Sequence, residues 1–185
     1  MTTIPDRIRL SLKESSPVST HCYIGVITPD NPRLVHARFV LFDGQPSVVL
    51  PTLAAIWAGH ARYDTPALIT AILAGDWEYL DPDITATTGS GIARQHPVPG
   101  VGMTLACIND GTVDGAEPVT VFPLCHAAHL DAERIYLVEA GTATIGVHTG
   151  DGSLVAGYQL SDCLPPPTEN RRPPTGPRPT VGAPR

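Results

Sequence analysis

Residues 134–160, RIYLVEAGTATIGVHTGDGSLVAGYQL, decide the fold of this chain. Apolar and polar residues alternate along much of the stretch, with Ala143, Ile145 and Val147 falling on one face. A period of two residues is typical of a strand with one buried side. Gly-Asp-Gly at 150–152 is a hairpin turn signal. The stretch therefore predicts three antiparallel strands joined as a meander: 134–140, 142–149 and 153–160.

Further strands are predicted on the N-terminal side of the meander. Residues 21–28 and 33–42 enclose the turn sequence PDNP at 29–32, which predicts a hairpin. Residues 7–15 alternate in the same way and predict an earlier strand. Two more strand-like runs lie at 103–108 and 119–124.

Two short helices are predicted in the middle of the chain. Pro51 can open the first and Gly59 can end it. Thr65 can cap the second, Pro66 opens it and Gly75 closes it. Helices of this length are marginal in isolation, so we expect them to pack as a pair against a sheet. The order of elements predicts an α+β fold with a mainly antiparallel sheet and the helix pair on one face.

The composition changes near the C-terminus. Residues 1–163 are predicted to form a single α+β domain, followed by a Pro/Arg-rich tail at 164–185. Residues 165–185 hold 8 of the chain's 20 prolines and one bulky aliphatic residue, Val181. Such a segment buries too little surface to offset its ordering entropy, so we expect it to be disordered. Within it, RRPPTGP at 171–177 fits a basic residue followed by P-x-x-P, a pattern that aromatic grooves bind.

The charge balance limits the classes of partner. With 18 acidic and 12 basic residues the net charge is −6, which argues against a general nucleic-acid binder or an anionic-membrane binder. No apolar run has the roughly 18 residues of a membrane span. Eleven arginines against one lysine, Lys13, indicate a G+C-rich and hence bacterial source. The polar N-terminus lacks a secretory signal, so we expect a cytoplasmic protein with reduced cysteines.

One cluster of residues has the chemistry of a metal site. Cys125, His126 and His129 lie close together, and thiolate and imidazole both bind zinc. A metal-assisted hydrolase would need a distant third ligand, for which the chain offers His21, Cys22 and Cys107. Asp131 or Glu133 would act as base. The other interpretation is a short helical turn between two strands, with Cys125 partly buried, both histidines near solvent and no cofactor.

Aromatic residues cluster around the second predicted helix. Trp57, Tyr63, Trp77 and Tyr79 are candidate anchors of a protein interface, since Trp and Tyr are enriched at such surfaces. They also suit the core of a chain with few aromatic residues. The sequence therefore leaves two hypotheses for function. The first is a small acidic interaction or regulatory module without catalytic activity, bound to another protein. The alternative is the hydrolase with a Cys/His site near residues 125–133.

Overall fold

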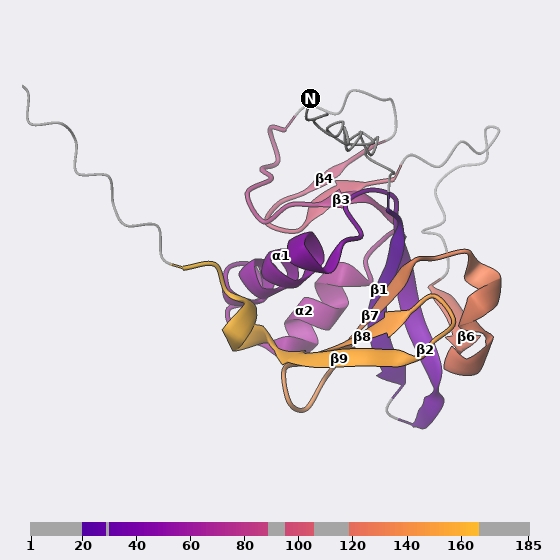
Figure 1. The fold of residues 1–185 in the computed structure, drawn as a ribbon. Helices are drawn as coiled ribbons and strands as arrows, with labels where there is room; N and C mark the ends of the chain where they lie inside the picture. The colour runs from indigo at the N-terminus through magenta and orange to yellow at the C-terminus, as the bar shows by residue number, and fades with distance from the viewer. Residues whose placement is uncertain (1–19, 29, 89–94, 106–118, 167–185) are drawn as a thin grey trace, which may run out of the picture.

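The computed structural model describes residues 20–28, 30–88, 95–105 and 119–166. They form an α+β fold in which helices pack on a mixed sheet (Figure 1). The strands are β1 (Cys22–Thr28), β2 (Asn31–Val40), β3 (Trp77–Leu80), β4 (Pro97–Val98), β5 (Gly102–Thr104), β6 (Thr120–Pro123), β7 (Arg134–Glu139), β8 (Thr144–Thr149) and β9 (Leu154–Gln159). The helices are α1 (Pro46–Ala58), α2 (Thr65–Ile72) and the 3-10 helices η1 (Leu124–Leu130) and η2 (Leu160–Cys163).

The local strand pairings follow the sequence pattern. β1 and β2 form the predicted antiparallel hairpin, and β7, β8 and β9 form the predicted meander. The described strands run in the order β4-β5-β3-β2-β1-β7-β8-β9, and β6 pairs with the middle of β2, from Leu34 to Ala37. The three-stranded meander is therefore confirmed, and β9 lies at one end of the sheet.

The prediction of a mainly antiparallel sheet is wrong, because the sheet is mixed. β7 runs parallel to β1, with Cys22 beside Arg134 and Val26 beside Val138, and β3 runs parallel to β2 at Val40. The parallel pair lies at the centre of the sheet and is covered on both faces. Accordingly, four consecutive residues of β7, from Ile135 to Val138, are buried. A continuous buried run of this kind is typical of a central strand, whereas alternation marks a half-exposed one.

Both α-helices begin earlier in the sequence than predicted, α1 by five residues and α2 by one. α1 starts at Pro46 rather than Pro51, which lies inside the helix. α2 has Asp64 rather than Thr65 at its N-cap, where the Asp64 carboxylate accepts a hydrogen bond from Ala67 N. Pro46 suits the first turn because it has no N–H that needs a partner there.

The sheet has a hydrophobic core on each face. Buried residues of α1 and α2, such as Leu53 and Ile72, pack with Ile24 and Val138 of the central strands. On the opposite face a smaller cluster includes Val35, Ala37, Phe122, Ala127, Ile135 and Leu137, and η1 and β6 cover it. The two α-helices thus lie on one face of the sheet, as predicted (Figure 1).

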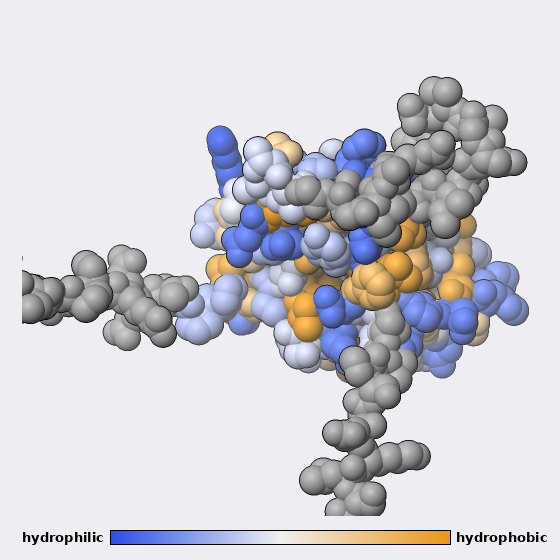
Figure 2. Space-filling model, turned by 90° about the horizontal axis from the view of Figure 1, so that it is seen from above, coloured by the Kyte–Doolittle hydropathy of each residue, from blue (hydrophilic) through white to orange (hydrophobic). Residues whose placement is uncertain are grey.

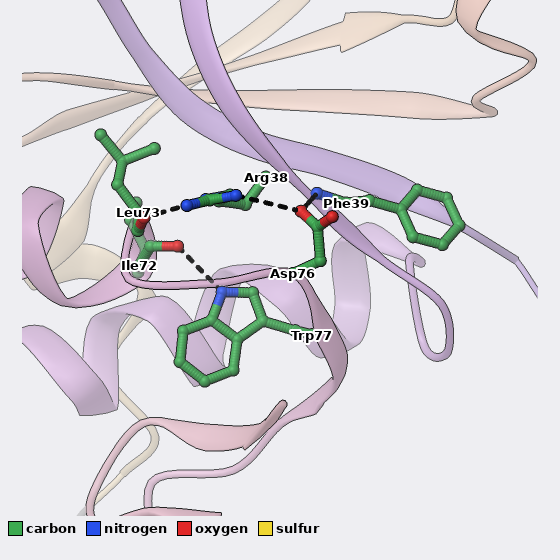
Figure 3. A network of polar contacts seen from close by, with 6 residues as sticks. All are labelled: Arg38, Phe39, Ile72, Leu73, Asp76 and Trp77. Carbon is green, nitrogen blue, oxygen red and sulfur yellow. Dashed lines mark hydrogen bonds and ion pairs between the residues drawn. The ribbon is translucent and has the colours of Figure 1, made fainter. Parts of the chain in front are cut away.

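A buried polar network ties the end of α2 to the sheet (Figure 3). Arg38 of β2 is 3% exposed, and its Nε donates to the carbonyl oxygen of Leu73, 2.9 Å away. Its Nη1 lies 3.9 Å from the Asp76 carboxylate. The same carboxylate oxygen accepts a hydrogen bond from Phe39 N at 3.0 Å. The pair therefore joins the C-terminus of α2, the edge of β2 and the start of β3.

Some predictions fall on residues that the structure does not describe. The predicted strand at 7–15, Cys107 and the tail beyond residue 166 lie outside the described residues. Leu164 is described, and it packs against the larger core cluster. Within the described part of the chain, no helix is both long enough and apolar enough to span a membrane.

Candidate interaction surface

The outer strand β9 is the most exposed apolar element of the sheet. Leu154, Val155 and Tyr158 are 66%, 60% and 42% exposed. The strand, LVAGYQ, carries no charged residue. Among the described strands it pairs with β8 alone, so its other edge faces away from the sheet. Apolar residues also reach the surface between hydrophilic ones on the face seen in Figure 2.

The backbone of β9 presents hydrogen-bonding groups at this outer edge. Leu160 N donates to Ala143 O at 2.9 Å, which fixes which residues face β8. In an antiparallel pair, alternate residues direct their N–H and C=O groups to the same neighbour. Gly157 and Gln159 therefore direct theirs outward. The ladder is interrupted at Val155, where the register shifts between Val147 and His148. The regular open edge consequently begins after this bulge.

The turn before β9 is fixed by the Asp151 carboxylate. It accepts hydrogen bonds from the Thr149 hydroxyl and from Ser153 N, the latter at 3.0 Å. These hydrogen bonds, that of Thr149 first, hold the pKa of Asp151 below its ordinary value. Gly152 adopts a φ of +88°, and a Cβ there would lie 2.2 Å from the carbonyl oxygen of Leu124. The hairpin therefore needs glycine at this position.

The far end of β9 is anchored in the core. Leu160, which follows the strand directly, is completely buried. It begins η2, which packs against α1. With a fixed turn at one end and a buried anchor at the other, β9 is held as a preformed edge. An edge of unpaired N–H and C=O groups is a template for another strand.

The four predicted aromatic anchors do not form one surface. Trp77 is completely buried and its Nε1 donates to Ile72 O at 2.8 Å, so it is a core anchor. Tyr79, on β3, is half-buried. Trp57 and Tyr63 do lie together, with ring centroids 5.0 Å apart and an interplanar angle of 84°. Of the four residues, only Trp57 and Tyr63 form a ring contact that includes a surface side chain, because Tyr63 is exposed.

The predicted metal ligands lie on the surface of η1. Cys125, His126 and His129 are all exposed, and the two imidazole centroids are 6.4 Å apart. The expected partial burial of Cys125 is wrong, because its side chain lies on the outer side of η1. Within the described ranges, no group of three or more His, Cys, Asp or Glu side chains is placed to hold a metal ion. Cys22 lies in the cluster beneath the α-helices, whereas η1 packs on the opposite face. Burial also raises the pKa of the Cys22 thiol. The zinc hydrolase therefore stays a hypothesis without a third ligand among these residues.

Comparison with known proteins gives no guide to function. No protein-family model matches the chain, and no significant match was found among curated proteins or solved structures. The functional argument therefore depends on the surface of this molecule alone.

Sequence reasoning did not single out β9 as a candidate site. The alternation in residues 153–160 predicts one drier face, but at the end of the sheet both faces of β9 are accessible. The available signal was the combination of adjacent Leu154 and Val155 with an uncharged strand that follows the last turn. Natural edge strands are commonly protected by charged residues or proline, and this strand has neither.

Proposed function

We propose that this chain is a non-catalytic protein-interaction module that accepts an extended segment of another protein along the outer edge of β9. The observation that supports the proposal is the uncharged strand with exposed apolar side chains and one open edge. Addition of a strand to a sheet edge is a recurring mode of peptide recognition. The arginine-rich composition supports a bacterial source.

The backbone and the side chains of β9 have different roles in this proposal. The N–H and C=O groups of Gly157 and Gln159 pair with the backbone of the incoming segment, which provides affinity without sequence preference. Leu154 and Tyr158 contact its side chains and favour apolar residues. Exposed Asp151 and Asp162 flank the strand in a chain of net charge −6. The partner segment should therefore carry apolar residues in its middle and basic residues at its ends.

A proline at Gly157 tests the proposal directly. Gly157→Pro removes an outward N–H, and proline is tolerated on an edge strand when its nitrogen faces solvent. Gly157→Ala is the matched control, because it keeps the N–H and its Cβ would lie 3.9 Å from the nearest atom, Thr144 Cγ2. We expect partner proteins to be captured from a cell extract by wild type and Gly157→Ala, but not by Gly157→Pro. With one captured protein purified, hydrogen exchange should slow in β9 on binding.

Three outcomes would contradict the proposal. The first is equal capture by all three proteins, and the second is slowed exchange confined to another element. The third is a wild-type dimer that Gly157→Pro dissociates, since the edge would then be occupied by a second copy of the chain. Circular dichroism and the thermal midpoint of each variant establish that the fold is retained.

A further inference from the structure

Two glycines face each other across β8 and β9, where Gly146 pairs with Gly157. A glycine inside a strand weakens it and commonly marks a place where another group approaches the backbone closely. A Cβ on Gly146 would lie 3.0 Å from His148 Nε2, so the imidazole of His148 accounts for the first glycine. A Cβ on Gly157 would meet one atom within 4 Å, Thr144 Cγ2 at 3.9 Å. The described residues therefore leave the space over Gly157 open.

The glycine pair opens to the face of the sheet on which η1 lies. Ile145 and Val147, the neighbours of Gly146 in β8, belong to the core cluster under the α-helices. Successive side chains of a strand point to opposite faces, so Gly146 and Gly157 open to the other face. Gly146 also pairs with Leu137 of β7, which belongs to the cluster on the η1 face. A residue that pairs with Gly157 on an added strand directs its side chain to this same face.

Side chains border the glycine pair at both ends. On one side, the Gln159 amide donates to Thr144 Oγ1 at 3.1 Å. On the other side, Leu154 Cδ1 lies 3.5 Å from the position that a Cβ of Gly146 would take, next to the His148 imidazole. Thr144 and His148 are four residues apart in β8, about 13 Å along the strand. Between these borders, Gly146 and Gly157 form a flat area without side chains of its own, which we call the glycine platform.

His148 presents an unpaired nitrogen to the glycine platform. The residue is 6% exposed, and its Nδ1 lies 3.1 Å from Gly152 O. A carbonyl oxygen can only accept, so Nδ1 carries a proton and Nε2 of the neutral ring is an acceptor. No described residue donates to Nε2. Among the described residues, the unpaired side-chain atoms that are sealed from solvent are Thr28 Oγ1 and Trp57 Nε1, so His148 Nε2 keeps access to solvent.

We propose that the segment bound along β9 places a tyrosine opposite Gly157, with its ring over the glycine platform and its hydroxyl donating to His148 Nε2. This inference rests on the proposed function, because the tyrosine belongs to the added strand. The residue opposite Gly157 lies two strand spacings from Gly146, about 9–10 Å, and a tyrosine side chain with one hydrogen bond spans that distance. A ring packed over a glycine of the neighbouring strand supplies the contacts that glycine lacks. Phenylalanine or leucine in this place would cover the platform but leave Nε2 unpaired.

Three acetylated peptides, Arg-Thr-Val-X-Val-Thr-Arg with Tyr, Phe or Leu at X, test the proposal on the full chain. A ¹⁵N-correlated NMR titration follows the β9 amide signals and gives each dissociation constant, and a long-range ¹H–¹⁵N spectrum follows His148 Nε2. All three peptides should move the amide signals of Gly157 and Gln159. The tyrosine peptide should bind about three- to ten-fold more tightly than the phenylalanine peptide, as one net hydrogen bond provides, and it alone should shift the Nε2 signal. The leucine peptide should bind most weakly, because it has no ring to cover the platform.

Two substitutions of His148 separate the roles of its nitrogens. The side-chain amide of asparagine reaches the place of Nδ1, whereas that of glutamine reaches the place of Nε2. His148→Gln should therefore keep most of the preference for the tyrosine peptide over the phenylalanine peptide, and His148→Asn should abolish it. Circular dichroism establishes that each variant folds, and the comparison of peptides on the wild-type chain does not depend on either variant.

The outcomes separate this inference from the proposed function. If the β9 signals move but the tyrosine and phenylalanine peptides bind equally, the inference is overturned and the proposed function stands. A tyrosine preference that persists in folded His148→Asn would overturn the inference in the same way. If no peptide moves the β9 signals, the proposed function is contradicted, and the inference fails with it.

Discussion

Replacing Arg38 by methionine tests whether the buried network of Figure 3 holds α2 to the sheet. The substitution keeps an unbranched side chain in the space between α2 and β2 but removes every donor. Leu73 O loses its hydrogen bond from Nε, and the Asp76 carboxylate loses its cation. Asp76 retains the hydrogen bond from Phe39 N.

The expected loss of stability follows from the burial of the two partners. Hydrogen bonds to charged groups contribute about 1.5–3 kcal/mol, and removal of one partner of a buried ion pair costs about 3–5 kcal/mol. The Asp76 side chain is 17% exposed and keeps one donor, which places the cost near the lower limit. We therefore expect Arg38→Met to lower the free energy of unfolding by about 3 kcal/mol. With an m-value of about 2 kcal/mol/M, the urea midpoint falls by about 1.5 M.

The assay is equilibrium urea unfolding followed by circular dichroism. Arg33→Met is the matched control, because Arg33 lies on the same strand with an exposed side chain and should change stability by less than about 0.5 kcal/mol. A double-mutant cycle with Asp76→Asn should give a coupling free energy of about 1–3 kcal/mol. A loss below about 1 kcal/mol in Arg38→Met would refute the reasoning, since that is the contribution of an exposed pair.

Two further predictions concern the strands. Because the pKa of Asp151 is lowered in the folded protein, its ionised form stabilises the β8–β9 turn above its ordinary pKa of 3.8, and this contribution is lost as the pH falls through the lower folded value. Unfolding measured from pH 7 to pH 2 should show wild type more stable than Asp151→Asn at neutral pH, with the difference shrinking in acid; a constant difference would contradict this. Gly25→Ala should destabilise the protein by about 1–3 kcal/mol or more, because its Cβ would lie 2.0 Å from the backbone oxygen of His36. Gly141→Ala is the control, because no atom lies within 4 Å of its Cβ, and it should leave the thermal midpoint nearly unchanged. Equal thermal midpoints for the two variants would contradict the prediction, since they would show that β1 and β2 can separate to admit the added Cβ.

The candidate site illustrates why residue type alone did not locate function. Trp57 and Trp77 flank the same helix and have the same chemistry, but one lies beside a surface loop and the other under the sheet. Burial of each ring depends on which face of its element the rest of the chain covers. The separation of Cys22 from η1 has the same origin, because the sheet lies between them. No spacing along the chain encodes these relationships.

Local patterns were sufficient for the hairpin, the meander and the existence of both helices, because side-chain period and turn chemistry act over a few neighbouring residues. The parallel pairing of β1 with β7 joins Cys22 to Arg134 and was decided only in the tertiary structure. So was the sharing of one edge of β2 by β3 and β6. Such pairings depend on burying two sheet faces at once under separate groups of helices. That condition applies to the whole chain. No single stretch of sequence could therefore predict the order of the strands or the open edge of β9.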